Sequence, residues 1–169
     1  MMEVFGDQYI RTPVNKSRSY QEFLLLNYLH KNNFPTCKPI AGYVEKSRFF
    51  YRAELIVEYI KSITFKEYLQ RYNSCEDDFA YLGMIIAKFH KYSVFHGDLN
   101  ITNILVKNYD LNKKDFYIID FDKSKLLSKI KTLEVEKNLA RLKRSLKKNN
   151  LFNDIFWQRL ISGHRKEFI

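Results

Sequence analysis

The sequence predicts an α+β protein, with a helix and a small antiparallel sheet in its first third and mostly helices after that. Residues 49–60 alternate apolar and polar side chains and can pair with the preceding stretch 40–45 as an antiparallel hairpin. Residues 76–91 and 132–148 have apolar side chains at helical spacing. With 169 residues, 46% of them hydrophobic, the chain can bury one sizeable core and is too short for two large domains.

The first helix is predicted to begin at Ser19 and to end before Pro35. Ser19 followed by Glu22 has the pattern of a capping box, in which both side chains bond to free N–H groups of the first turn. Asn32 and Asn33, followed by Pro35, favour the end of the helix. The predicted inward face consists of Phe23, Leu26 and Leu29 or His30.

Two helices are predicted directly after the hairpin. Ser62 or Thr64 can cap a short helix over residues 64–72. A longer helix over residues 76–91 begins with acidic residues and ends with basic ones, as the helix dipole favours. Its predicted inward stripe consists of Phe79, Leu82, Ile86 and Phe89 or His90.

The last part of the chain is predicted to be helical. Residues 132–148 form a basic amphipathic helix, whose apolar side is made of Val135, Leu139, Leu142 and Leu146. Its other faces carry Lys137, Arg141, Lys143, Arg144, Lys147 and Lys148. A final helix from Leu151 contains Trp157 and is expected to end at Ser162 and Gly163, because glycine commonly terminates helices.

The chain carries 29 Lys and Arg against 19 Asp and Glu, and the net charge of +10 favours an anionic partner. Nucleic acid, a phosphorylated substrate and an acidic lipid surface all fit this charge, as does a solvated Lys-rich surface. No nucleic-acid partner is expected, because no helix-turn-helix, zinc-binding or aromatic and basic stacking pattern is present. Without a membrane-spanning run or a secretory signal, we expect a cytoplasmic protein with Cys37 and Cys75 as reduced thiols.

Residues 96–122 have the order of groups found at phosphoryl-transfer centres, with an Asp, an Asn five residues later and a second Asp after two apolar runs. Asp98 is predicted to accept the proton of the attacking hydroxyl. Asn103 and Asp120 are predicted to hold Mg²⁺, which prefers carboxylate and amide oxygens. The apolar runs around them, 104–106 and 117–119, can pair as a hairpin and bring these two residues together.

For any single Asp or Asn at a strand end, turn formation or capping is the commoner explanation, and only the joint pattern favours catalysis. His96 lies two residues before Asp98, and we predict that it packs against the metal-binding loop and hydrogen-bonds to backbone rather than acting as a base. His90 is predicted to be a core or rim residue. His30 and His164 have no convergent partners in the sequence, and no histidine is expected to bind a metal.

The stretches HGDLNITNILV (residues 96–106) and YIIDFDKS (residues 117–124) resemble the lipopolysaccharide kinase family within the protein-kinase-like fold. Within that family they are most similar to the kinases of 3-deoxy-D-manno-octulosonic acid (Kdo). Three further stretches agree, namely SYQEFLLLNYLHKNNFPTCKPIAG, FFYRAELIVEYI and NLARLKRSLKK. The resemblance extends over nearly the whole chain, from Phe5 to Leu160.

The resemblance implies a two-lobed kinase-like fold, with a partial sheet lobe over residues 1–61 and a mostly helical lobe over residues 62–169. It implies ATP and Mg²⁺ as cofactors and a Kdo hydroxyl on a lipid A precursor as acceptor, at the 4-position, in lipopolysaccharide core biosynthesis. Such an enzyme would work peripherally at the cytoplasmic face of the inner membrane, whose anionic surface suits a basic protein.

The same resemblance assigns roles to single residues. Asp98 matches the catalytic Asp, and Asn103 and Asp120 match the metal ligands. Glu22 matches the helix Glu that pairs with a nucleotide-binding Lys. The residues that match the hinge contacting adenine are Glu58, Tyr59 and Ile60.

The sequence also departs from the kinase pattern. Gly97 stands where regulated protein kinases have Arg, and no Ala-Pro-Glu element follows, so protein substrates and activation-loop regulation are not expected. A Gly-rich loop and a strand Lys normally precede the helix that carries Glu22, and neither Gly6 nor Lys16 fits these roles. We therefore expect a shortened chain, a start inside a longer reading frame, or a loss of full activity.

Two further functions stay open. Small-molecule phosphotransferases of the aminoglycoside and choline type share the His-Gly-Asp and terminal Asp pattern. A catalytically impaired kinase-like protein would instead bind a membrane or a partner through the basic helix 132–148. The sequence predicts no particular oligomeric state.

Overall fold

The computed structural model describes residues 8–10, 13–111 and 113–168. The chain divides into two compact units, with the division between Tyr59 and Ile60. The resemblance placed this division slightly later, between residues 61 and 62. Gly6, which we considered for a phosphate-binding loop, lies outside the described residues.

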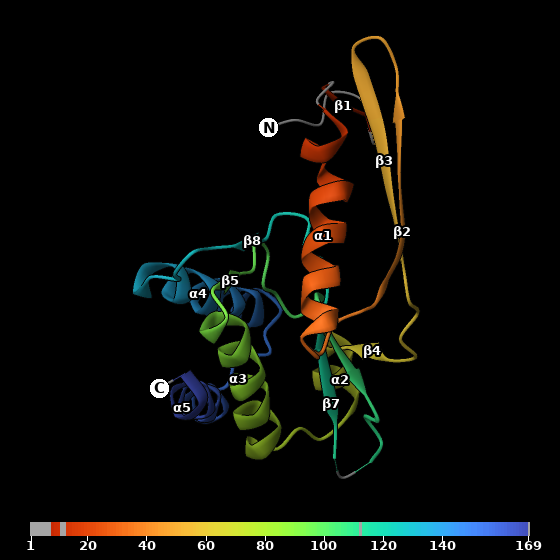
Figure 1. Ribbon diagram of the computed structural model, residues 1–169. Helices are drawn as coiled ribbons and strands as arrows, with labels where there is room; N and C mark the ends of the chain where they lie inside the picture. Colours follow the sequence, from red (N-terminus) through yellow and green to blue (C-terminus); the bar gives the residue numbers. More distant parts are fainter. Residues whose placement is uncertain (1–7, 11–12, 112, 169) are drawn as a thin grey trace. The chain divides into compact units, whose positions relative to one another are not determined.

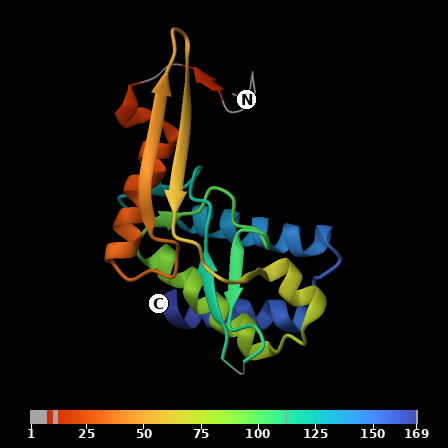
Figure 2. The same ribbon diagram turned by 90° about the vertical axis from the view of Figure 1, so that its right-hand side faces the viewer.

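The first unit contains one long helix and a three-stranded antiparallel sheet (Figure 1). Its elements are β1 (Gln8–Ile10), the 3-10 turn η1 (Val14–Lys16), α1 (Arg18–Lys31), β2 (Pro39–Lys46) and β3 (Phe50–Val57). The strands lie in the order β1-β3-β2. The predicted hairpin of β2 and β3 is confirmed, with Val44 opposite Ala53. Figure 2 shows α1 alongside this hairpin.

Helix α1 begins earlier than predicted. Its N-cap is Ser17, whose hydroxyl donates to the carbonyl oxygen of Val14 at 2.6 Å and so does not cap the helix. The 3-10 turn leads directly into the helix, since the N–H of Gln21 already donates to the carbonyl oxygen of Ser17 at 3.1 Å. Ser19 is therefore a buried residue inside the first turn, and the predicted capping box with Glu22 is wrong. The buried apolar side chains of α1 are Leu25, Leu26 and Leu29.

The second unit is mostly helical, as predicted, and contains two small antiparallel sheets (Figure 1). Its helices are α2 (Phe65–Arg71), α3 (Glu76–Lys91), α4 (Thr132–Lys148) and α5 (Asp154–Phe168). Its strands are β4 (Ile63–Thr64), β5 (Val94–Phe95), β6 (Ile104–Lys107), β7 (Asp115–Ile118) and β8 (Lys125–Leu126). The strand order is β4-β6-β7 in one sheet, and β5 pairs with β8 in the other. Within the described residues, no helix combines the length and apolar character that crossing a bilayer requires.

Of the two caps that the sequence allowed for helix α2, Ser62 and Thr64, the structure uses Thr64. Thr64 Oγ1 accepts a hydrogen bond from the N–H of Glu67 at 3.1 Å, and the Glu67 carboxylate accepts one from the N–H of Thr64 at 2.9 Å. This reciprocal pair satisfies two N–H groups that the first helical turn leaves free. Helix α3 likewise begins and ends at the predicted residues.

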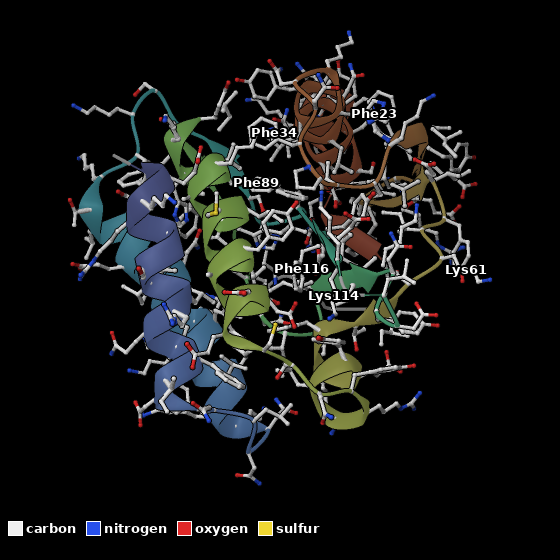
Figure 3. The ribbon with its side chains drawn as sticks, turned by 90° about the horizontal axis from the view of Figure 1, so that it is seen from below. Phe23, Phe34, Lys61, Phe89, Lys114 and Phe116 are labelled. Carbon is white, nitrogen blue, oxygen red and sulfur yellow. The ribbon has the colours of Figure 1, made fainter. Side chains whose placement is uncertain are left out.

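Aromatic rings fill the core between α2, α3 and the β6–β7 hairpin. The ring centroid of Phe65 lies 5.4 Å from that of Phe79 and 5.8 Å from that of Phe116. Phe116, labelled in Figure 3, also contacts Tyr81 of α3 with a centroid separation of 6.0 Å. The predicted inward stripe of α3 is confirmed as buried and consists of Phe79, Leu82, Ile86, Phe89 and His90.

Helices α3 and α5 lie side by side and approach closely at two glycines (Figure 1). A Cβ atom on Gly83 would lie 2.1 Å from the carbonyl oxygen of Leu160, and one on Gly163 would lie 2.0 Å from that of Ala80. No larger residue fits at either contact without moving a helix backbone. The predicted helix end at Gly163 is wrong, because this glycine permits close packing and α5 continues to Phe168.

Helix α4 covers the predicted residues but turns a partly polar face inward. Its buried residues are Val135, Asn138, Leu142 and Leu146. Leu139, which the helical spacing placed on the buried side, is only half-buried. Asn138 takes the central buried position instead, and the reason lies in the loop that α4 covers.

Candidate active site

The candidate active site is built on the loop between β5 and β6, here called the catalytic loop (residues 96–103). Asp98 lies in this loop and Asn103 ends it, directly before β6. Asp120 follows β7, which pairs antiparallel with β6. The N–H of Ile119 donates to the carbonyl oxygen of Asn103 at 3.0 Å, so the strand pairing places Asp120 beside the end of the loop.

A single amide joins the three predicted residues. The Nδ2 atom of Asn103 donates to the backbone carbonyl oxygen of Asp98 at 3.0 Å and to Oδ2 of Asp120 at 3.1 Å. The structure thus brings Asn103 and Asp120 together, as the predicted hairpin implied, and places the backbone of Asp98 beside Asn103. Asp120 has a φ of 63°, a left-handed conformation that Asp and Asn tolerate better than most residues. This conformation turns the chain away two residues after the end of β7.

The donor set beside the catalytic loop fits Mg²⁺. Because Nδ2 of Asn103 is used on Asp98 and Asp120, the amide oxygen Oδ1 remains available to a cation, and Asp120 adds an exposed carboxylate. Mg²⁺ in proteins commonly takes few protein oxygens and completes its shell with water and substrate phosphates. Among the described residues, no group of three or more His, Cys, Asp or Glu side chains converges on one point, so no all-protein cage is present there.

His96 has the structural role that the sequence predicted. Its side chain is buried, and its Nε2 lies 3.0 Å from the carbonyl oxygen of Ile119, to which it donates. Its Nδ1 accepts the N–H of Asp98 at 3.1 Å. Both ring nitrogens are therefore used by the backbone, and the ring packs edge-on against Phe121 with centroids 4.8 Å apart. A general-base role would require Nδ1 to give up the N–H of Asp98.

Asn138 of α4 clamps the backbone of His96. Its Nδ2 donates to the carbonyl oxygen of His96 at 2.6 Å, and its Oδ1 accepts the N–H of His96 at 3.1 Å. The same Oδ1 lies 3.1 Å from Nε2 of His90, which donates to it. Asn138 is 1% exposed, so leaving these groups unpaired would be costly. This explains why α4 buries an Asn where the apolar spacing predicted Leu139.

Two further residues of α4 contact the catalytic loop. The N–H of Ile101 donates to the Ser145 hydroxyl at 3.1 Å. The guanidinium of Arg141 donates through Nη1 to Oδ1 of Asp98 at 2.9 Å. Asn138, Arg141 and Ser145 follow one another at helical spacing, so one side of α4 holds the loop at three points. None of these three roles was predicted from the sequence. The feature of the sequence that could have revealed these roles is the set of polar residues on the side of the helix that also carries Leu142.

A buried histidine pair links α5 to this clamp. Nε2 of His164 donates to Nδ1 of His90 at 2.8 Å, and His90 passes its other N–H to Asn138. The sequence gave His164 no convergent partner, and this is wrong in space, because close packing of α3 and α5 joins the two rings. Burial, with a smaller contribution from the neighbouring His164, lowers the pKa of His90 to about 4. Burial also lowers the pKa of His96 to about 4 and lowers that of His164.

Because these histidines are buried and neutral, we expect the free energy of unfolding to fall in mild acid. The unfolded chain takes up protons below about pH 6.5, whereas His90 and His96 stay neutral in the folded state down to about pH 4. Their contribution is therefore full above about pH 6.5 and is lost as the pH falls from there towards 4. Between about pH 7.5 and 5, the free energy of unfolding should fall by about 2 kcal/mol for each of them.

Urea denaturation at a series of pH values measures this loss. His90→Gln should reduce the pH dependence, while the same change at the exposed His30 should leave it as in the wild type. An unfolding free energy that stays constant across this pH range would contradict the prediction.

The residues predicted to contact the nucleotide lie outside the catalytic loop, and all of them except Ile60 belong to the first unit. Glu22 lies on α1, Glu58 directly follows β3, and Tyr59 is 85% exposed at the end of the first unit. Burial raises the pKa of the Cys37 thiol, and the carboxylates of Glu22 and Glu58 contribute to the rise. Ile60 is the first residue of the second unit.

Comparison with known proteins gives one family. The model of the "Lipopolysaccharide kinase (Kdo/WaaP) family" matches residues 1–164. A 3-deoxy-D-manno-octulosonic acid kinase from Pasteurella multocida is 37% identical over 166 residues, which cover 94% of this chain and 68% of that protein. The corresponding protein from Vibrio cholerae is 34% identical, with 98% of this chain and 70% of that protein covered.

Solved structures share the fold. WaaP in complex with acyl carrier protein matches with a TM-score of 0.67 and 16% identity, over 88% of this chain and 66% of that chain. The Rio2 kinase–ADP/Mg²⁺–phosphoaspartate complex from Chaetomium thermophilum matches with a TM-score of 0.57 and 17% identity, over 90% of this chain and 50% of that chain. At such low identities the likeness concerns the fold alone. It confirms the predicted α+β, protein-kinase-like class.

Proposed function

Because this chain belongs to the lipopolysaccharide kinase (Kdo/WaaP) family, we propose that it transfers the γ-phosphoryl group of ATP to a hydroxyl of Kdo. The acceptor in this proposal is the 4-hydroxyl of a Kdo residue on a lipid A precursor, in lipopolysaccharide core biosynthesis. Support comes from relatives named as Kdo kinases that are up to 37% identical. The single observation that carries the chemistry is the amide of Asn103, which ties the Asp98 backbone to the Asp120 carboxylate.

In the proposed reaction, Asp98 acts on the acceptor hydroxyl. One of its oxygens, Oδ1, is held by Arg141 at 2.9 Å, and we assign the proton to the other, Oδ2. The hydroxyl oxygen forms a bond to the γ-phosphorus, the bond from that phosphorus to the bridging oxygen breaks, and ADP leaves. The hydroxyl proton passes to Asp98, so the products are the sugar phosphate, ADP and one proton.

Asn103 and Asp120 are the proposed ligands of Mg²⁺, which would neutralise charge on the phosphates when it is bound. The hydrogen bond from Asn103 to the Asp98 carbonyl oxygen orients the amide for this role. Glu22, Glu58, Tyr59 and Ile60 remain proposed contacts on the nucleotide side, assigned from the family resemblance.

We also propose that the protein works peripherally at the anionic, cytoplasmic face of the inner membrane. The net charge of +10 supports this, since basic surfaces gain affinity for acidic lipid. The exposed basic residues of α4 that would take part are Lys137, Arg144, Lys147 and Lys148.

Incubation of the protein with radiolabelled ATP, Mg²⁺ and Kdo-lipid A tests the proposal. We expect label on the lipid and none on an aminoglycoside or choline, the acceptors of the alternative phosphotransferases. Phosphoryl transfer to one of those acceptors alone would replace the proposed substrate. Salt-sensitive binding to anionic liposomes with no transfer to any acceptor would instead indicate a kinase-like binding protein.

A further inference from the structure

We propose that Arg141 recognises a carboxylate on the acceptor sugar and so makes the active site selective for acidic sugars. The inference rests on the function proposed above and deepens it, because Kdo is a sugar acid. It concerns a side chain of the basic helix α4 that touches the carboxylate of Asp98 and that no sequence motif singled out.

The guanidinium of Arg141 lies beside the proposed catalytic carboxylate of Asp98. Nη1 of Arg141 lies 2.9 Å from Oδ1 of Asp98, the residue proposed to receive the hydroxyl proton. An acceptor hydroxyl must approach an oxygen of that carboxylate to within about 2.6–3.2 Å. Any acceptor bound in this way therefore has its neighbouring substituents beside Arg141. The side chains of both residues are reachable, with exposed fractions of 45% for Arg141 and 40% for Asp98.

The guanidinium of Arg141 has more N–H donors than its contact with Asp98 uses. A guanidinium has five N–H groups in a planar fork, which matches both oxygens of a carboxylate. Among the contacts of the described residues, the side chain of Arg141 donates one N–H, to Asp98. Enough of the fork remains to bind a second carboxylate while the first contact is kept. A lysine has no such fork, because its ammonium group is a point charge.

The proposed acceptor carries a carboxyl group close to the hydroxyl that reacts. In Kdo the carboxyl group is attached to the ring carbon that lies two positions from the carbon bearing the 4-hydroxyl. An acceptor whose 4-hydroxyl meets Asp98 can therefore turn this carboxylate towards the neighbouring guanidinium of Arg141. A neutral sugar would offer only hydroxyls there, and these form weaker hydrogen bonds with a cation than a carboxylate does.

The part of α4 that carries Arg141 is held against the catalytic loop by hydrogen bonds. Asn138 and Ser145 bond to the catalytic loop on either side of Arg141 along α4, at His96 and at Ile101. The backbone of Arg141 is thus fixed relative to Asp98, and a recognition group on a fixed helix loses little freedom when it binds. Lys137, Arg144 and Lys148 share its face of the helix at helical spacing and are exposed, so the surroundings favour an anion.

The test compares two acceptors that differ only at the carboxyl group. These are Kdo-lipid A and its derivative in which the Kdo carboxyl is reduced to a primary alcohol, assayed by kcat/KM for transfer of labelled phosphate. The wild type should prefer the carboxylate by about 10- to 100-fold. Arg141→Gln should abolish this preference, and Arg141→Lys should retain part of it. Arg71→Gln removes the same charge at an exposed position in the last turn of α2 and should keep the wild-type preference.

A role for Arg141 in holding Asp98 alone would lower transfer to both acceptors by the same factor, and that result would overturn the proposal. A higher KM for ATP with an unchanged preference between the acceptors would overturn it too, because it would assign the guanidinium to the nucleotide.

A binding measurement separates this inference from the proposed function. Free Kdo and its carboxyl-reduced form are titrated into the wild type and Arg141→Gln by NMR, without ATP. Tighter binding of Kdo to the wild type, lost in the variant, supports carboxylate recognition by Arg141. Equal affinities in both proteins refute it. A wild type that phosphorylates neither acceptor overturns the proposed function, and the titration still decides the role of Arg141.

Discussion

Asp98→Asn is expected to lower kcat for phosphoryl transfer by about 10²- to 10⁴-fold, the contribution typical of a positioned general base. The amide keeps the size of the side chain and its place beside Arg141, but it cannot take up the hydroxyl proton. The backbone of the loop should stay intact, because the carbonyl oxygen of Asp98 still accepts from Asn103. Steady-state kinetics with labelled ATP and Kdo-lipid A measures the loss.

Asp154→Asn is the matched control, since it makes the same change at an exposed residue in the first turn of α5. We expect kcat in this variant within about twofold of the wild type, as is usual for surface substitutions away from a site. If Asp98→Asn retained a wild-type kcat, the proton would have to go elsewhere and the assignment of Asp98 would be wrong.

Asn138→Leu is expected to reduce the free energy of unfolding by roughly 3–5 kcal/mol and to lower kcat as well. Leucine has a similar size, so the cost arises from hydrogen bonds rather than from a cavity. The change leaves the N–H and carbonyl of His96 and the Nε2 of His90 without their partner in a buried place. Urea denaturation gives the stability, and phosphoryl transfer by the folded fraction gives the activity.

The matched control is Asn149→Leu at the end of the same helix. There the amide donates one hydrogen bond, to the carbonyl oxygen of Ser145 at 2.8 Å, at a half-buried position. We expect a loss of about 1 kcal/mol and an unchanged kcat. Equal losses in the two variants would mean that Asn138 contributes no more than an ordinary helix end and does not position the catalytic loop.

Gly97 departs from the pattern of regulated protein kinases, and the sequence alone does not explain why. It stands where regulated protein kinases have Arg, and the structure provides a steric reason. A Cβ atom at this position would lie 2.2 Å from the carbonyl oxygen of Lys123, on the segment that follows Asp120. The backbone of the catalytic loop therefore lies against that segment, and any side chain at residue 97 would push the two apart.

Local patterns predicted those features that depend on neighbouring residues. The hairpin of β2 and β3 and the ends of α3 follow from alternation, helical spacing and charge at the helix ends. The failures occurred where one residue type serves two purposes. Ser17 and Ser19 are both acceptable N-caps, and the path of the preceding turn selects the first. Gly163 is as suitable for close helix contact as for a helix end, and packing against Ala80 selects the former.

The sequence by itself indicated the candidate reacting groups of this protein. Asn103 directly precedes β6 and Asp120 follows β7, and the pairing of these adjacent strands is a local consequence of alternation and turn length. Asp98 lies in the loop that leads into Asn103. What holds these groups was decided only by the tertiary structure. Asn138 reaches His96 across 42 positions of sequence and Arg141 reaches Asp98 across 43, while the histidine pair spans 74. Such contacts depend on how α4 and α5 pack, and the period of a helix does not reveal which neighbour its polar residues will meet.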